Sequence, residues 1–160
     1  MKTLVIGYGN SLRGDDGVGP WVAEQVAEWN LPEVRSLSVH QLTPELATEV
    51  AEAEVVFFID ACVMEAGKTQ ACLEPIAPQP EKSRIDHLWS PSVLVHLAQT
   101  LYGADPIAYQ ILIPALQFDY GAPLSAIARE GRAWSLETLK HYFNNLPSPS
   151  GKEALCMKLA

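Results

Sequence analysis

The sequence predicts a single α/β domain built in three layers, with helices on both faces of a mostly parallel five-stranded sheet. Short apolar runs rich in β-branched residues alternate along the chain with longer segments of helical periodicity, which is typical of βαβ units. The chain has 160 residues, of which 48% are hydrophobic, so it is long enough for one sizeable core and short for two.

The first predicted strand, 2–7, is an almost entirely apolar run that ends at a glycine. Such a run suits a central strand that is buried on both faces. A helix is expected over 18–29, because apolar residues recur there with the spacing of one buried stripe. Asp15 and Asp16 then fall at the N-terminus of this helix, where a carboxylate is favourable against the helix dipole and can cap free N–H groups.

The next segments predict a second βαβ unit. The strand 34–39 shows partial alternation of apolar and polar residues, and a helix is expected to begin at Thr43, a capping residue that stands before a proline. The strand 54–60 gives the clearest signal, because five consecutive large apolar side chains precede Asp60 at its carboxyl end.

The second half of the chain supplies two more strands and a helix between them. The strands are expected over 70–76 and 107–113, the latter stopped by Pro114. The helix should begin near Ser90 and stop at Gly103. Four of its residues are predicted to face inward: Val93, Leu94, Leu97 and Leu101.

A last helical region is expected over 123–146, and it completes a domain that spans 1–146. The remaining residues, 147–160, lack amphipathic periodicity and are predicted to form a flexible tail. The apolar residues of this last region that should cover the sheet are Ile127, Trp134, Leu139 and Phe143.

Composition narrows the classes of function. Nineteen acidic against eleven basic residues give a net charge of −8 and a pI of about 4.9. Because this charge repels phosphate backbones and anionic lipids, we expect no nucleic-acid or membrane partner. The apolar runs are too short to predict a transmembrane helix or a secretory signal. Three cysteines without CxxC spacing disfavour a disulfide framework or a zinc–thiolate site and fit a reducing cytoplasm.

Carboxyl groups are expected to gather at one edge of the sheet. In an open parallel sheet, ligands bind beyond the carboxyl ends of the strands, where the strand order reverses. In a flavodoxin-like order that point lies between the first and third strands, so Asp15 and Asp16 should converge there with Asp60. Each residue also has a structural interpretation, Asp15 or Asp16 as a helix cap and Asp60 as an acceptor for backbone amides.

His87 is a candidate third ligand, because it lies in a polar stretch just before the helix that begins near Ser90. It would share the edge with Asp60 if the strand 70–76 runs parallel to the strand 54–60. Two carboxylates and an imidazole suit nickel, zinc, manganese or iron, with positions left open for water or substrate. Structural or surface roles are expected for His40, His96, His141 and Cys62.

Two other interpretations of the glycine-rich loop fit these residues less well than a metal site. A dinucleotide-binding loop would have a third glycine where Leu12 stands, and its phosphates would face Asp15 and Asp16. A receiver domain of two-component signalling also has paired acids after its first strand and an aspartate after its third. Here, however, residues 8–14 separate the strand from the acids, and no lysine occurs in 114–119.

The segment 7–19 closely resembles GxGNxLxxDDGxG, the signature of the [NiFe]-hydrogenase maturation endopeptidases. Shorter matches follow in the same order, and the similarity extends from residue 1 to about residue 143. These shorter matches are 42–46 (LTPEL), 58–61 (FIDA), 86–88 (DHL) and 90–91 (SP).

The resemblance implies a flavodoxin-like, phosphorylase/hydrolase-like fold and an enzyme that removes a C-terminal extension from a hydrogenase large-subunit precursor after nickel insertion. By position, Asp16, Asp60 and His87 correspond to the metal-binding and catalytic residues, with His96 as the fallback for His87. The nickel would be supplied by the precursor, and other divalent metals could occupy the site in vitro. The protein implied is a cytoplasmic monomer.

The sequence departs from the family pattern in three places. The spacing between His87 and the following helix is about one residue shorter than in some members, which makes His87 the least secure of the three ligands. Some members carry glutamate at the position of Asp16, so the shorter side chain alters its reach. Some members carry an acidic residue near the end of the second strand, where this chain has His40 and Gln41, and no role is assigned there. The alternative function is a receiver-like or nickel-binding module without enzymatic activity.

Overall fold

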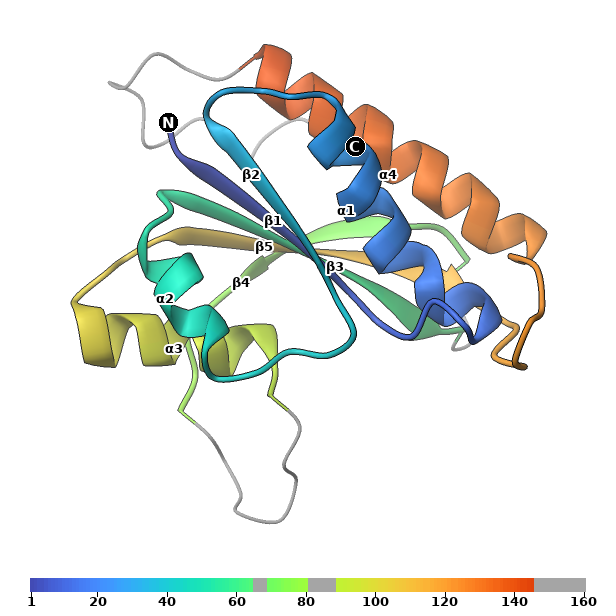
Figure 1. Ribbon diagram of the computed structural model, residues 1–160, viewed down its shortest axis with the longest axis horizontal. Helices are drawn as coiled ribbons and strands as arrows, with labels where there is room; N and C mark the ends of the chain where they lie inside the picture. The colour runs from blue at the N-terminus through green and yellow to red at the C-terminus, as the bar shows by residue number, and fades with distance from the viewer. Residues whose placement is uncertain (65–68, 81–88, 146–160) are drawn as a thin grey trace.

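The computed structural model describes residues 1–64, 69–80 and 89–145. Within these ranges five strands form one sheet in the order β2-β1-β3-β5-β4 (Figure 1). The first four strands in this order run parallel, and β4 pairs antiparallel with β5 at the edge. The predicted five-stranded, mostly parallel sheet is therefore confirmed. The strands are β1 (Thr3–Tyr8), β2 (Val34–Val39), β3 (Val55–Val63), β4 (Cys72–Ile76) and β5 (Ile107–Ala115).

Helices cover both faces of the sheet and complete the three layers. Helices α1 (Val18–Glu28) and α4 (Ala126–Asn144) lie on one face, and α2 (Leu46–Ala51) and α3 (Pro91–Tyr102) lie on the other (Figure 1). A short 3₁₀ helix, η1 (Gly14–Gly17), leads into α1. Within the described residues, no helix is both long and apolar enough to span a lipid bilayer.

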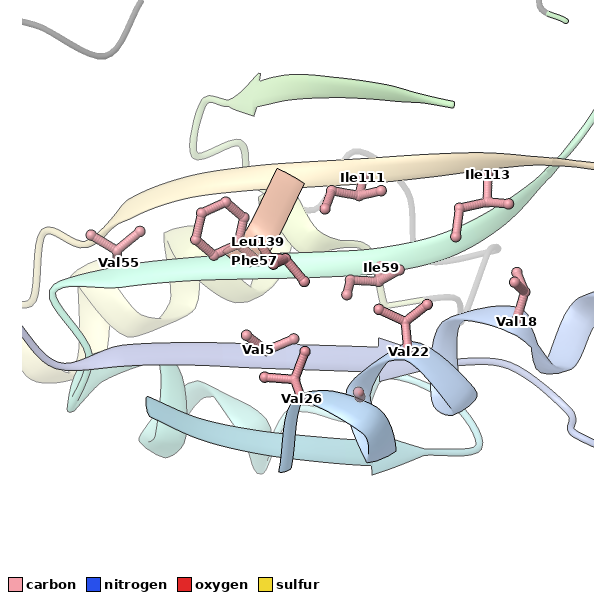
Figure 2. Close-up of a cluster of buried hydrophobic side chains, with 11 residues drawn as sticks. Val5, Val18, Val22, Val26, Val55, Phe57, Ile59, Ile111, Ile113 and Leu139 are labelled. Carbon is pink, nitrogen blue, oxygen red and sulfur yellow. The ribbon is translucent and has the colours of Figure 1, made fainter. Parts of the chain in front are cut away.

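Alternation along the central strands creates two cores, one on each face. Val5, Phe57 and Ile111 point toward α1 and α4, where they pack with the apolar stripe of α1 (Figure 2). Ile6 and Phe58 belong to the second core, beneath α2 and α3. Because successive residues of β1 and β3 serve opposite cores, these strands read in the sequence as continuous apolar runs.

Strands β3 and β5 extend further than the sequence predicts. Asp60 does not end β3, since pairing with β5 continues from Asp60 opposite Leu112 to Val63 opposite Ala115. Pro114 likewise does not end β5. The antiparallel neighbour β4 pairs with β5 only as far as Leu112, so Pro114 lies beyond it and removes no hydrogen bond to β4.

The predicted strand 70–76 exists as β4, but the parallel direction on which the placement of His87 depended is wrong. Strand β4 is an outer strand, and it exposes Glu74 and Pro75. Because β4 runs antiparallel, it ends at the edge of the sheet where the parallel strands begin, away from Asp60. Helix α3, about 18 Å long, ends just before β5 begins, so its first turn points back toward the carboxyl edge.

The predicted helix start at Thr43 is wrong, because α2 begins at Leu46. The amides of Leu46 and Ala47 donate to the carbonyls of Thr43 and Pro44, three residues back in each case, so this segment forms turns before the helix.

The predicted ends of α3 are confirmed. The Ser90 hydroxyl accepts a hydrogen bond from the Val93 amide at 3.3 Å, and Gly103 adopts the left-handed conformation with φ 65°. The inward face is partly different, since Leu101 is 60% exposed and Val95 is buried instead. The buried stripe of α3 is therefore rotated toward Val95 and away from Leu101.

Helix α4 approaches the sheet mainly through small residues. Leu139 is buried, and Trp134 and Phe143 pack against the core as predicted, whereas Ile127 is not among the residues of either core. The predicted tail, 147–160, lies outside the described residues. The small buried residues that let α4 lie close to the sheet are Ala128, Gly131, Ser135 and Thr138.

Candidate functional site

The strand order reverses between β1 and β3, and two carboxylates come together at this point. Asp16 lies in η1, which contacts β3, and Asp60 lies on β3 itself. The negative charge of Asp16 contributes to a raised pKa of Asp60, so the two groups interact electrostatically. The structure thus brings Asp16 and Asp60 to the same edge, as the sequence predicts.

Two glycines allow η1 to lie against the sheet. Gly9 has φ 140°, and a Cβ atom there would collide with the Asp16 carbonyl oxygen. A Cβ atom at Gly19 would collide with the carbonyl oxygen of Ile59, the residue before Asp60. The Asp16 carboxylate is held by the backbone amide of Asn10, which donates to Oδ2 at 2.8 Å. The glycine-rich signature therefore serves close backbone contact in this chain.

Asp15 has a different role from its neighbour. It is completely buried, and its carboxylate accepts hydrogen bonds from the amides of Leu116 at 2.8 Å, Gln117 at 3.1 Å and Ser125 at 2.7 Å. The Ser125 hydroxyl donates a fourth, at 2.6 Å. Asp15 therefore ties the loop between β5 and α4 to the glycine-rich loop, and it does not cap α1.

The pKa of Asp15 reflects this set of donors. Burial by itself raises the pKa, but the hydrogen bonds from Ser125, Leu116 and Gln117 together outweigh it and leave the pKa below its ordinary value. Asp15 is consequently ionised, and its carboxylate stabilises the loop between β5 and α4.

Asp60 is far less well supplied with donors. Desolvation is the largest cause of its perturbation, and with the charge of Asp16 it raises the pKa to about 6. Hydrogen bonds from the Tyr8 hydroxyl and the Ala61 amide oppose this shift without cancelling it. Asp60 therefore exchanges a proton close to neutral pH, which is unusual for an aspartate.

Tyr8, at the end of β1, is itself hydrogen-bonded on both sides. Its hydroxyl donates to Asp60 and accepts from Gln110 Nε2 at 3.2 Å. Burial first, and then the charge of Asp60, raise the pKa of Tyr8 far above its ordinary value. The hydroxyl is therefore a permanent donor at the pH where Asp60 titrates.

The predicted histidine ligand cannot be placed, because His87 lies outside the described residues. The fallback, His96, lies half-buried on α3, where its Nε2 is 3.5 Å from the Thr100 hydroxyl. His40 directly follows β2 and His141 lies in the last turn of α4, both exposed. Across 1–64, 69–80 and 89–145, no three His, Cys, Asp or Glu side chains gather closely enough to hold a metal, so His96 does not join the two aspartates.

Three residues of this edge were missed in the sequence. Tyr8 and Gln110 continue the alternation of β1 and β5 on the face that carries Asp60, so a polar atom at these positions was a usable signal. Ser125 gave a weaker signal, since a serine before a helix is read as an N-cap. It does cap α4, through its hydroxyl and the Ala128 amide, in addition to binding Asp15.

Neither a family model nor a curated protein matches this chain. Solved structures do match. One is the [NiFe] hydrogenase maturation protease HycI from Thermococcus kodakarensis KOD1, with 20% identity and a TM-score of 0.70 over 90% of this chain and 93% of that one. The maturation protease HybD from Thermococcus kodakarensis has 21% identity and a TM-score of 0.65 over 88% and 98% of the two chains.

A third similar structure is the hydrogenase maturating endopeptidase HybD from E. coli, with 19% identity and a TM-score of 0.67 over 90% of this chain and 93% of that one. About nine-tenths of both chains is covered in this comparison. The described part of the chain therefore has the fold of the [NiFe] hydrogenase maturation proteases.

Proposed function

We propose that this protein is an endopeptidase that removes the C-terminal extension of a [NiFe]-hydrogenase large-subunit precursor after nickel insertion. One observation carries the proposal. Asp16 interacts with Asp60, whose pKa is raised to about 6, at the strand-order reversal of a fold shared with solved hydrogenase maturation proteases. The glycine-rich signature supports it, because its glycines let the segment that carries Asp16 pack beside Asp60.

In this proposal nickel belongs to the substrate and not to the resting enzyme. Asp16 and Asp60 would supply two oxygen ligands, and His87 would supply the third. Two like charges held near each other in a partly desolvated setting favour an added cation or a proton, as the raised pKa of Asp60 indicates. A precursor without nickel would lack this contact, so cleavage would depend on correct loading of the metal.

The chain also has groups suited to hydrolysis. Nickel held by the precursor can polarise the scissile carbonyl or activate a water molecule. Before a metal binds, the pKa of Asp60 is about 6, and a bound cation would lower it. Asp16 or Asp60 would accept the proton of the attacking water.

Exposed apolar side chains near this edge support a protein substrate. Leu12, Val63, Leu116 and Tyr120 are all more than 60% exposed. Leu12 follows β1, Val63 is the last residue of β3, and Leu116 and Tyr120 follow β5. The backbone amide of Gly121 joins the segments after β1 and β5 by donating to the Leu12 carbonyl at 2.9 Å. Exposed apolar groups gathered beside a candidate site are typical of surfaces that bind another protein.

The decisive experiment incubates the protein with nickel-loaded and nickel-free precursor and follows the change in precursor mass. We expect cleavage of the loaded precursor alone, and its loss in Asp16→Ala, Asp60→Ala and His87→Ala. The matched controls, Asp105→Ala and His141→Ala, alter exposed side chains elsewhere and should cleave normally.

The other outcomes identify the alternatives. Equal cleavage of both precursors would refute the dependence on nickel. Nickel binding without any cleavage would indicate a metal-binding module, and labelling of Asp60 by acetyl phosphate would indicate a receiver. The sheet already differs from a receiver's 2-1-3-4-5 order, because β5 lies inside the antiparallel edge strand β4.

A further inference from the structure

We infer that Tyr8 and Gln110 are positioning residues that hold the Asp60 carboxylate in place for cleavage, through a hydrogen-bond relay across three neighbouring strands. The inference rests on the proposed function for its kinetic consequence. The relay itself is a feature of the fold, so its effect on Asp60 can be tested without a substrate.

The sheet register places the three side chains on one face. Tyr8 is on β1, Asp60 on β3 and Gln110 on β5, and these strands are adjacent and parallel. Because side chains alternate, residues two positions apart share a face. The residues two positions earlier on the same strands all belong to the core beneath α2 and α3, and they are Ile6, Phe58 and Ala108. The relay therefore lies on the same face as this core, with Gln110 opposite Phe58 and with Asp60 two positions further along β3.

The chemistry of the three groups sets the direction of the relay. Gln110 Nε2 can only donate, and it donates to the Tyr8 oxygen at 3.2 Å. A tyrosine hydroxyl has a single hydrogen, which is then directed to Asp60, its other partner. Gln110 thus acts on Asp60 only through the hydroxyl of Tyr8.

The consequence is a fixed carboxylate. The Ala61 amide and the Tyr8 hydroxyl are the donors to Asp60 among the described residues, and the amide belongs to the adjacent residue of the same strand. Only Tyr8 therefore ties Asp60 to a different strand. Without it the carboxylate could turn about its side-chain bonds, and small displacements of a reacting group are costly in rate.

The test compares Tyr8→Phe, Gln110→Met and the double variant with the wild type. Tyr142→Phe is the matched control, because it removes the hydroxyl of another half-buried tyrosine, one that contacts the Met1 sulfur. With nickel-loaded precursor, we expect kcat to fall about tenfold in Tyr8→Phe while KM stays within about twofold, as for other outer partners of ligating groups. The double variant should be no slower than Tyr8→Phe, since Gln110 acts through Tyr8.

Crystal structures of the same proteins give the second measurement. Asp60 should keep one rotamer in the wild type and in Tyr142→Phe, and should turn or split in Tyr8→Phe and Gln110→Met. An unchanged Asp60 rotamer in Tyr8→Phe, or additive losses of kcat in the double variant, would overturn the inference. A wild type that cleaves no precursor refutes the proposed function instead, and the crystal structures still decide whether the relay holds Asp60.

Discussion

Asp15 and Asp60 are carboxylates at the same edge of one sheet, yet the protein treats them in opposite ways. Asp15 has no exposed surface, and four hydrogen bonds keep its pKa below the ordinary value. Asp60 keeps some exposure, and its pKa is nevertheless raised to about 6. The acid without exposed surface is therefore the ionised one, because its hydrogen bonds outweigh its desolvation.

The difference shows that hydrogen-bond donors and neighbouring charge, set against desolvation, decide whether a buried carboxylate has a lowered or a raised pKa. The carboxylate of Asp15 accepts hydrogen bonds from the loop between β5 and α4, so Asp15 stabilises the fold. Asp60 has fewer donors and a like charge nearby, so it retains capacity for a proton or a cation. Structural and functional acids can thus stand side by side in one signature.

The largest effect is expected for Asp15→Ala. Removal of the carboxylate leaves three partly buried backbone amides and a hydroxyl without their acceptor, and we expect a loss of about 3–5 kcal/mol in the free energy of unfolding. Urea unfolding measures it, with the exposed Asp105→Ala as control. A loss below about 1 kcal/mol would mean that the loop after β5 is held by other contacts.

Ser125→Ala probes the same anchor from the other side. The hydroxyl donates to Asp15 at 2.6 Å and accepts from the Ala128 amide at 3.3 Å, so the substitution removes a charge-assisted hydrogen bond and a helix cap. We expect a destabilisation of about 2 kcal/mol in urea unfolding. Ser125→Thr keeps both hydrogen bonds and should recover most of the loss; equal losses in the two variants would contradict this account.

Asp60→Asn should abolish cleavage and yet stabilise the protein at neutral pH. An acid whose pKa is higher in the folded state loses stability as pH rises from its unfolded pKa, 3.8, through its folded pKa of about 6. An amide has no charge to desolvate, so we expect a gain of about 1–2 kcal/mol at pH 7.5.

Thermal unfolding between pH 4 and 7.5 checks this prediction, because the advantage of Asp60→Asn should grow with pH up to about 6 and then level off. Asp15 gives the opposite slope. Its lowered pKa means that its stabilisation is complete above 3.8 and is lost only as pH falls below that value. A constant advantage at every pH would show that Asp60 does not titrate as described.

The smallest effect concerns the coupling between the two site acids. Asp16→Asn removes a negative charge that raises the pKa of Asp60, so that pKa should move down toward its ordinary value. It should not reach that value, because desolvation is the larger cause. A ¹³C NMR titration of the Asp60 carboxyl group measures the shift, and an unmoved pKa would show that the two acids are not coupled.

Much of the fold could be predicted from the sequence because burial on two faces leaves a plain signature. The apolar runs at 2–7 and 54–60 marked β1 and β3, and Gly103 marked the end of α3. The strand direction of β4 could not be predicted, since an outer strand has no pattern that distinguishes parallel from antiparallel pairing. The end of β3 was misplaced because Asp60 looked like a terminus, whereas β5 continues alongside it.

The site was predictable where a residue type and a topological position coincide, as for Asp16 and Asp60. The separate roles of Asp15 and Asp16 were not, because the donors to Asp15 come from residues about a hundred positions later in the chain. The same reason hid Tyr8 and Gln110, whose contact spans 102 positions. The assignment of His87 stays a prediction.

The two residues that β4 exposes affect how the molecule behaves among its own copies. An outer strand with free N–H and C=O groups can pair with the outer strand of another molecule and start an aggregate. Pro75 has no N–H to offer in such a pairing, and a second molecule's Glu74 would meet the same charge on the first. The exposed residues of β4 therefore make this side of the sheet a poor template for strand pairing between two molecules.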